Sequence, residues 1–253
     1  MWKVVLDSIE GVSHKREQLG CQDSSVCAEI QTFIGPMFCI VCSEGAGSAK
    51  YAAHASQYAC QLVLKRLCDH FGSGKTMNDL TKELIRSWLT ELRSYFEKQA
   101  ESNNTTINDY ACTLLMCVLS WNDAIFAQIG DGAIVVYNGY HYEPIFWPES
   151  GEYINTTFFV TSPTLEEKLN YTCRIGIIDE LAVFTDGLQM LSLDFAKKQA
   201  HQPFFTPLFN RLREEEATES LVPLLDGFLQ SDKVNARTDD DKTLVLATRH
   251  NVY

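Results

Sequence analysis

The sequence predicts an α+β fold, and three observations lead to that prediction. Two long stretches, residues 49–71 and 77–101, carry apolar residues at helical spacing. Short apolar runs of strand type, separated by turns that contain Gly and Asp, lie before and after these stretches. No repeat, low-complexity segment or linker rich in Pro, Gly and Ser divides the 253 residues. We therefore expect a single domain spanning residues 1–253.

The first half of the chain is predicted as strand, strand, helix, helix. A short strand at 2–6 is followed by a polar stretch that continues to Gly20. A second strand at 36–42 ends at the sequence SEGAGS, where Gly and Ser break the strand and helical sequence begins. The sequence GSG at 72–74 separates the two helices. Because this break is short, we expect the helices to run antiparallel.

The second half is predicted to be mainly β-structure. Runs at 112–119, 124–129 and 133–137 predict an antiparallel meander. Residues 139–175 are irregular and predict a flap around a short strand at 157–161. A strand at 181–184 ends at the sequence TDG. Two helical stretches follow it, and a closing strand at 242–248 comes directly after TDDD.

The composition indicates a globular protein with a substantial core and a surplus of acidic groups. Hydrophobic residues make up 45% and charged residues 21%, and 21 Lys and Arg against 33 Asp and Glu give a net charge of −12. Nucleic acids and anionic membranes require clustered cations, so we expect neither as a partner. The chain contains no apolar run of membrane-spanning length and begins without the pattern of a signal peptide, which predicts a cytoplasmic location.

The nine cysteines do not predict a disulfide framework, because their number is odd and their spacing irregular. In a reducing compartment they are expected to stay free. Cys39 and Cys42 form a CxxC, a pattern also found in metal and redox sites. They lie within an apolar run and no second CxxC follows, so we expect them to be buried as small hydrophobic residues.

Acidic residues recur where the predicted strands end. The four places are Gln22-Asp23, Glu44-Gly45, Asp186-Gly187 and the Asp run at 239–241. Clusters of carboxylate oxygens suit hard divalent ions such as Mg²⁺ and Mn²⁺. Turns also favour Asp and Gly for purely structural reasons, so one such motif alone predicts little. Four in one chain, each beside an apolar strand, favour a metal site.

Taken in order, the motifs resemble those of the metal-dependent protein phosphatases of the PPM family (type 2C). The resemblance extends from Ser13 to about Ala247 and is greatest to the compact bacterial branch. Each motif is short, but six of them in this order are specific. They are SHKREQLGCQD, SEGAGSA, ACTLL, IGDGAIV, FTDGL and DDDKTLVLA.

The resemblance implies two packed antiparallel β-sheets flanked by helices, a four-layer αββα sandwich that holds two divalent ions, Mn²⁺ or Mg²⁺. It assigns Asp131 to turn formation and leaves it outside the metal set. Asp241 occupies a position where the family often has Asn. Asp109 matches a region that supplies an acid for a third, weaker ion. The implied ligands of the two main ions, of which the four carboxylates are also the implied catalytic residues, are Asp23, Glu44, the carbonyl of Gly45, Asp186 and Asp240.

The implied activity is hydrolysis of phosphomonoesters on serine and threonine of a partner protein, opposing a kinase. In the mechanism that the resemblance implies, two divalent ions would share a hydroxide for the attack on phosphorus and would neutralise the phosphoryl oxygens. No cysteine nucleophile is needed.

The sequence departs from the family pattern at three positions. The bridging acid is Glu44 rather than Asp, which lengthens its reach by about 1.5 Å. Ala46 stands where the eukaryotic branch often has His. Gln18 stands where the family commonly has its phosphate-binding Arg, which leaves His14 and the two cations after it, Lys15 and Arg16, as candidates. His14 could equally be a buried polar group with a purely structural role.

Two other functions stay open from the sequence. Glu44 keeps open a non-catalytic or weakly active PPM-fold module with a regulatory or binding role, although Asp23, Asp186 and Asp240 weigh against it. A phosphatase of small phosphometabolites is the other alternative.

Overall fold

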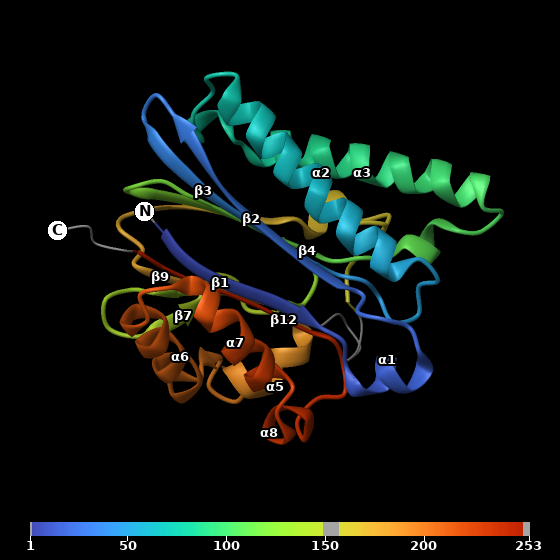
Figure 1. The fold of residues 1–253 in the computed structure, drawn as a ribbon. Coiled ribbons are helices and arrows are strands. Elements are labelled where there is room, and N and C mark those ends of the chain that lie inside the picture. The colour runs from blue at the N-terminus through green and yellow to red at the C-terminus, as the bar shows by residue number, and fades with distance from the viewer. Residues whose placement is uncertain (1, 149–156, 250–253) are drawn as a thin grey trace. The chain divides into compact units, whose positions relative to one another are not determined.

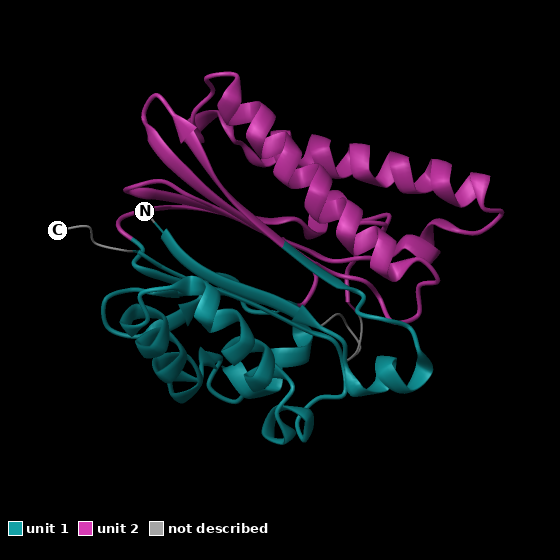
Figure 2. Ribbon diagram, viewed as in Figure 1, with its two compact units in different colours: residues 1–25, 132–148, 178–253 teal, residues 26–131, 149–177 magenta. Residues whose placement is uncertain are grey.

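The computed structural model describes residues 2–148 and 157–249, and the chain divides into two units (Figure 1, Figure 2). Unit 1 comprises residues 1–25, 132–148 and 178–253, and unit 2 comprises residues 26–131 and 149–177. Each unit contains one five-stranded antiparallel sheet and its own helices, as the α+β prediction requires. This division does not test the prediction of a single domain over residues 1–253.

The sheet of unit 1 has the strand order β1-β12-β9-β6-β7. Its strands are β1 (Trp2–Ile9), β12 (Lys242–Arg249), β9 (Glu180–Phe184), β6 (Ala133–Tyr137) and β7 (Tyr142–Pro144). In the pairing of β12 with β9, Leu244 lies opposite Phe184. The start of β12 therefore lies beside the end of β9, which brings the TDG turn next to the acidic run at 239–241.

The helices of unit 1 follow β1 and β9. In Figure 1, α6 and α7 lie along one face of the sheet, and their buried side chains, such as Phe205 and Leu225, join Leu244 and Leu246 of β12 in one core. The helices and short strands are α1 (Val12–Glu17), η3 (Asp186–Leu188), α5 (Gln189–Ser192), β10 (Leu193–Asp194), β11 (Gln199–Ala200), α6 (Gln202–Glu214), η4 (Thr218–Ser220), α7 (Leu221–Leu229) and α8 (Asp232–Asn235).

The sheet of unit 2 has the strand order β2-β3-β4-β5-β8. Its central strand, β4, is buried along its whole length, which is why the segment is uniformly apolar. β2 begins in unit 1 and continues into unit 2. The strands are β2 (Asp23–Thr32), β3 (Gly35–Glu44), β4 (Leu114–Leu119), β5 (Asp123–Ile129) and β8 (Asn170–Ile175).

Two long helices of unit 2 lie side by side over one face of this sheet and run in opposite directions, as the sequence predicts (Figure 1). They are α2 (Ala52–Gly72) and α3 (Lys82–Ser102). Apolar side chains at helical spacing, such as Val63 of α2 and Leu92 of α3, enter the core of the unit. The shorter helices are η1 (Met77–Asp79), η2 (Ile107–Tyr110) and α4 (Leu165–Lys168).

The structure differs from the predicted elements in four places. The ten-residue strand β2 lies in a segment for which no strand is predicted. The meander ends after β5, because β6 pairs with β9 and β7 in the sheet of unit 1. Residues 157–161 form no strand, whereas β8 lies within the segment predicted to be irregular. The polar stretch before Gly20 contains the helix α1. The central part of the predicted flap, residues 149–156, lies outside the described residues.

None of the nine cysteines, all of which lie in the described ranges, forms a disulfide, and five of them are buried. Cys39 and Cys42 have no exposed surface, so the prediction that this CxxC is buried is confirmed. Among the residues that the structure describes, no helix combines the length and the apolar composition needed to cross a lipid bilayer.

Candidate active site

Asp23 is a buried carboxylate at the start of β2, with 8% of its surface exposed. Its Oδ2 accepts hydrogen bonds from the hydroxyls of Thr185, at 2.7 Å, and Thr243, at 2.9 Å. Its Oδ1 is also buried and has no hydrogen-bond partner among the described residues. Burial raises the pKa of Asp23 well above its usual range, and the charges of Asp241 and Asp186 raise it further, while the threonine hydroxyls oppose the shift.

The two threonines that hold Asp23 come from the ends of adjacent strands. Thr185 follows β9 and Thr243 lies near the start of β12, and the amide of Thr243 donates to the hydroxyl of Thr185 at 3.1 Å. Asp186 comes directly after Thr185 and begins η3. The pairing of β9 with β12 thus positions Asp186 near Asp23, as the pKa of Asp23 also indicates.

Gly187 allows the turn after Asp186 to approach the acidic run closely. A Cβ atom at Gly187 would lie 2.0 Å from the carbonyl oxygen of Asp241, which no side chain can tolerate. The glycine of the TDG motif is therefore required by packing, and it keeps Asp186 and the residues at 240–241 in one place.

Asp240 and Asp241 differ in their surroundings. Asp240 is half-buried, and its Oδ1 accepts the amide of Asp241 at 2.8 Å. Asp241 has 2% of its surface exposed, and its two oxygens accept the amides of Gly11, at 2.6 Å, and Gln22, at 2.5 Å. One ligand atom of each of His14, Asp240 and Asp241 lies within 4.8 Å of the other two.

The three candidate phosphate-binding residues lie together on α1 but point differently. Lys15 and Arg16 are exposed, whereas His14 is buried with its Nδ1 2.9 Å from Oδ1 of Asp241. Gln18, at the position of the missing Arg, is exposed and ends the helix in a left-handed conformation with φ of 59°. Unit 1 therefore brings together His14, Asp23, Asp186 and Asp240, and the exposed cations Lys15 and Arg16 come directly after His14.

The acidic residues of unit 1 fit a divalent cation. Asp23 presents a buried oxygen that no described donor satisfies, and two more carboxylates influence its pKa. Carboxylate oxygens are the donors that hard divalent ions prefer, and a bound cation would supply the charge that this buried cluster lacks.

In unit 2, Glu44 is the last residue of β3 and is half-buried. Its amide donates to the hydroxyl of Thr113 at 3.0 Å, and its carbonyl accepts the amide of Thr113 at 2.9 Å, so its backbone is held firmly. Gly45 is buried and pairs with Cys112, and a Cβ there would lie 2.5 Å from the carbonyl of Ala52. This close approach explains the glycine.

Asp131, which the sequence analysis places outside the metal set, lies beside Glu44. Oxygens of the two carboxylates come within 4.8 Å of each other. Oδ2 of Asp131 accepts the hydroxyl of Thr157 at 2.5 Å. The preceding Gly130 has φ of 102°, and a Cβ there would meet Thr113 at 2.5 Å. The glycine permits the turn, and the turn directs Asp131 toward the end of β3, which the short IGDG motif alone does not reveal.

Asp109 takes part in the cap of η2. Its carboxylate accepts the hydroxyl of Thr105 and both the amide and the hydroxyl of Thr106, the latter two at 3.2 Å. These hydrogen bonds, that of Thr105 foremost, lower the pKa of Asp109. Its predicted part in a third ion site stays a prediction.

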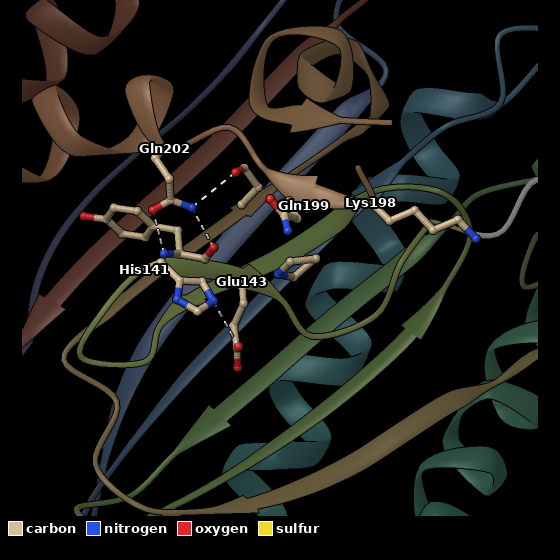
Figure 3. Close-up of a pocket in the computed structure, with 8 residues that line it drawn as sticks. His141, Glu143, Lys198, Gln199 and Gln202 are labelled. Atoms are coloured by element: carbon tan, nitrogen blue, oxygen red, sulfur yellow. Dashed lines mark hydrogen bonds and ion pairs between the residues drawn. The ribbon is translucent and has the colours of Figure 1, made fainter. Parts of the chain in front are cut away.

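A hollow of about 420 Å³ lies elsewhere in unit 1, between β7 and the β10–β11 hairpin (Figure 3). Figure 3 shows Gln202 bonded to the backbone of Tyr142 and His141 facing Glu143, at 3.8 Å. None of the predicted site residues lines this hollow.

Comparison with known proteins agrees with this arrangement of acidic strand ends. The sequence model of the family described as protein phosphatase 2C matches residues 10–226. The chain belongs to the protein phosphatase 2C family. The matched segment contains Asp23, Glu44 and Asp186 but stops before Asp240.

Individual relatives cover nearly the whole chain of this 2C phosphatase. Serine/threonine-protein phosphatase 3 of Escherichia coli (strain K12) is 33% identical over 252 residues, which are 97% of this chain and 98% of that protein. The structure of serine/threonine phosphatase Stp1 from Staphylococcus aureus has a TM-score of 0.64 at 15% identity and covers 99% of this chain and 96% of its own. The catalytic domain of PstP in complex with two manganese ions has a TM-score of 0.61 at 16% identity and covers 98% of this chain and 97% of its own.

Membership in the 2C family confirms two predictions from the sequence. The chain has the fold of these phosphatases, with two five-stranded antiparallel sheets and flanking helices. It is also an enzyme, a metal-dependent phosphoprotein phosphatase. At the position of the eukaryotic His, Ala46 is 5% exposed and packs among Ala49, Ala52 and Ala111, so it offers no proton donor.

Proposed function

We propose that this 2C phosphatase hydrolyses phosphoserine and phosphothreonine in a partner protein and that two divalent ions, Mn²⁺ or Mg²⁺, are its cofactors. The name of the Escherichia coli relative supports the substrate class, and the two manganese ions of the PstP structure support the cofactor. When bound, such ions activate the attacking water and neutralise charge on the phosphoryl group.

The observation that carries the proposal is the unpartnered buried oxygen of Asp23. Burying a carboxylate oxygen without a hydrogen-bond donor costs free energy. A neutral side chain at the start of β2 would avoid this cost. A function that requires the negative charge explains its presence. Cation binding is the function that fits, because the nearby charged groups, Asp186 and Asp241, are themselves acidic.

The proposed ligands are those named from the sequence. They are the carboxylates of Asp23, Asp186 and Asp240, then Glu44 and the carbonyl of Gly45, with Asp109 for a weaker third ion. The threonines that donate to Asp23 fix its Oδ2 and leave Oδ1 for an ion. The cations of α1, Lys15 and Arg16, are proposed to attract the phosphate group, with His14 beside them.

The test is hydrolysis of p-nitrophenyl phosphate and of a phosphothreonine peptide with Mn²⁺, with Mg²⁺ and with chelator. We expect turnover only with metal and a loss of at least about 100-fold in Asp186→Asn, because a ligand is removed where charge develops. The matched control is Asp194→Asn, a half-buried residue of β10 in the same unit, whose carboxylate accepts the amide of Lys197.

Two outcomes would contradict the proposal in different ways. If the wild type shows no metal-dependent turnover and Asp186→Asn changes nothing, the chain is a non-catalytic module of the 2C fold, the alternative that Glu44 supports. If sugar phosphates are hydrolysed faster than phosphopeptides, the substrate is a small phosphometabolite.

We further propose that residues 1–253 act as one phosphatase domain, that the protein works in the cytoplasm and that an opposing kinase supplies its substrate. The support is that no linker divides the sequence, that none of its nine cysteines forms a disulfide, as in a reducing compartment, and that phosphomonoester hydrolysis requires a reaction that forms the phosphomonoester.

A further inference from the structure

We propose that Asp241 is a positioning residue that fixes α1 and the start of β2 beside the start of β12, and that it is not itself a metal ligand. The inference rests on the proposed function only for its effect on catalysis. Its structural part concerns hydrogen bonds within unit 1.

Both oxygens of Asp241 are already engaged by backbone donors. Oδ1 accepts the amide of Gly11 at 2.6 Å, and Oδ2 accepts the amide of Gln22 at 2.5 Å. His14 Nδ1 also lies 2.9 Å from Oδ1, although the two atoms do not have the geometry of a hydrogen bond. With 2% of its surface exposed, Asp241 is as buried as a core residue. Because both oxygens already accept backbone amides, this carboxylate holds the chain in place, and a cation would have to compete with those donors for it.

The donors come from the two ends of one segment. Gly11 precedes α1 and Gln22 precedes Asp23, so Asp241 closes the segment between them into a loop with fixed ends. A charge-assisted hydrogen bond to a backbone amide is stronger than a neutral one, and burial strengthens it further. One side chain therefore sets the position of both the helix and the strand end.

The neighbouring backbone shows that α1 is fitted to this place. A Cβ atom at Gly11 would lie 2.3 Å from the carbonyl carbon of Asp240, so only glycine allows the approach. Ser13 donates its amide, at 2.9 Å, and its hydroxyl, at 2.6 Å, to the carbonyl of Asp239. Helix α1 has only six residues and is fixed by these tertiary contacts rather than by its own propensity.

The same geometry accounts for Asp at a position where the family often has Asn. An Asn side chain has one acceptor oxygen and an NH₂ group that only donates. It could satisfy the amide of Gly11 or that of Gln22 but would place its own donor against the other. Asp241 is thus the residue that two opposed amide donors require.

The consequence for the site is positional. On α1, Lys15 and Arg16 come directly after His14, which lies against Asp241. Asp23 comes directly after Gln22, and Asp240 comes directly before Asp241. Loosening Asp241 should therefore weaken the binding of phosphate and displace an oxygen ligand without removing one. His14, on this inference, supports Asp241 and does not contact phosphate.

The test is Asp241→Asn, with His14→Gln as a milder variant and Asp194→Asn as the matched control in the same unit. Hydrogen exchange of backbone amides is measured by NMR on the full chain without metal. We expect the protection of the Gly11 or the Gln22 amide to fall by about tenfold or more in Asp241→Asn, because one donor loses its acceptor. In His14→Gln both amides should stay protected while those of α1 exchange faster.

Two results would overturn the inference. Unchanged protection of both amides in Asp241→Asn would show that they do not depend on this carboxylate. A loss of protection spread evenly over both units would show that Asp241 supports the whole fold and not this segment. If Asp241→Asn does not fold, unchanged exchange of the α1 amides in His14→Gln would overturn the inference.

A second readout connects the segment to catalysis. With Mn²⁺ and p-nitrophenyl phosphate, both variants should raise KM by a larger factor than they lower kcat, since the cations of α1 would be displaced. A fall in kcat at constant KM would overturn the positioning role. If the wild type shows no metal-dependent turnover, the proposed function fails, while the exchange data still decide the role of Asp241.

Discussion

Asp23 shows how a single residue can reduce stability in the interest of binding. Its Oδ1 is buried without a donor among the described residues, and burial raises its pKa. The folded chain therefore binds a proton on Asp23 more tightly than the unfolded chain does, in which the carboxyl has its ordinary pKa of about 3.9. The stability of the metal-free protein should be full below that pH and should fall as the pH rises through the raised pKa.

Replacing Asp23 with Asn should remove this pH dependence. In Asp23→Asn the amide oxygen can keep the threonine bonds, and no charge is buried. At pH 7 and in chelator we expect the variant to be more stable by about 1–3 kcal/mol, measured by urea unfolding, with the difference shrinking toward pH 4. Addition of Mn²⁺ should stabilise the wild type and not the variant. A variant less stable than the wild type at pH 7 would contradict this account.

Glu44 permits a second test at the scale of one side chain. Its backbone is tied to Thr113, so shortening the side chain withdraws the carboxylate without moving the strand. Oxygens of Glu44 and Asp131 lie within 4.8 Å of each other, and two ligands on opposite sides of one small divalent ion lie about 4.2 Å apart. We therefore expect Glu44→Asp to weaken Mn²⁺ binding by about tenfold, measured by calorimetry.

The control for this change is Glu29→Asp on the exposed part of β2 in the same sheet, which should bind Mn²⁺ like the wild type. Tighter binding and a large gain in activity in Glu44→Asp would show instead that the longer side chain restrains the site.

At the scale of elements, Asp109 has two candidate roles, in the cap of η2 and in a third ion site, and the two can be tested separately. The carboxylate accepts three hydrogen bonds from Thr105 and Thr106, which order the turn before β4. Asp109→Ala should lower the melting temperature by about 2–4 °C to the same extent in chelator and in Mn²⁺. Thr106→Ala removes the partner of the cap and should have a similar effect. A loss that occurs only in Mn²⁺ would favour the predicted third ion site.

Elements with their own periodic pattern could be predicted from the sequence. The helices α2 and α3 carry apolar stripes, and β4 and the part of β9 after Glu180 are uniformly apolar because both faces are buried. Helix α1 carries no such pattern. It is short and largely exposed, and its fixing contacts come from residues more than 220 positions away, such as that of Ser13 with Asp239. A local pattern cannot reveal contacts of this kind.

The same distinction applies to the candidate site. Asp23, Asp186 and Asp240 could be named as candidates because each stands in a short motif at a strand end. The role of Asp241 could not, because its donors lie 230 and 219 residues away in the sequence. The nearness of Asp131 to Glu44 likewise depends on a glycine turn with φ of 102°, which the letters of the motif do not specify.

At the scale of the whole molecule, the net charge of −12 bears on the choice of substrate. Two divalent ions would add four positive charges and leave −8, so an acidic excess remains on the loaded enzyme. Phosphothreonine peptides with Lys and Arg beside the phosphorylated residue should have kcat/KM values about tenfold higher than peptides with Glu there. The advantage should diminish as salt is raised to about 0.5 M, because salt screens long-range attraction.

The measurement needs p-nitrophenyl phosphate as the control, since it has no flanking charges and should respond little to salt. Equal rates for basic and acidic peptides at low salt would show that local contacts, not the overall field, select the substrate.

The distribution of the cysteines has a practical consequence for spectroscopy. Cys68 and Cys173 are exposed and both belong to unit 2, whereas five of the other cysteines are buried. Burial raises the pKa of Cys27, and it raises that of Cys21 in unit 1 to about 12, so these half-buried thiols should react slowly. A maleimide dye applied briefly to the unmodified protein would therefore label unit 2 and leave unit 1 unlabelled, without any engineered cysteine.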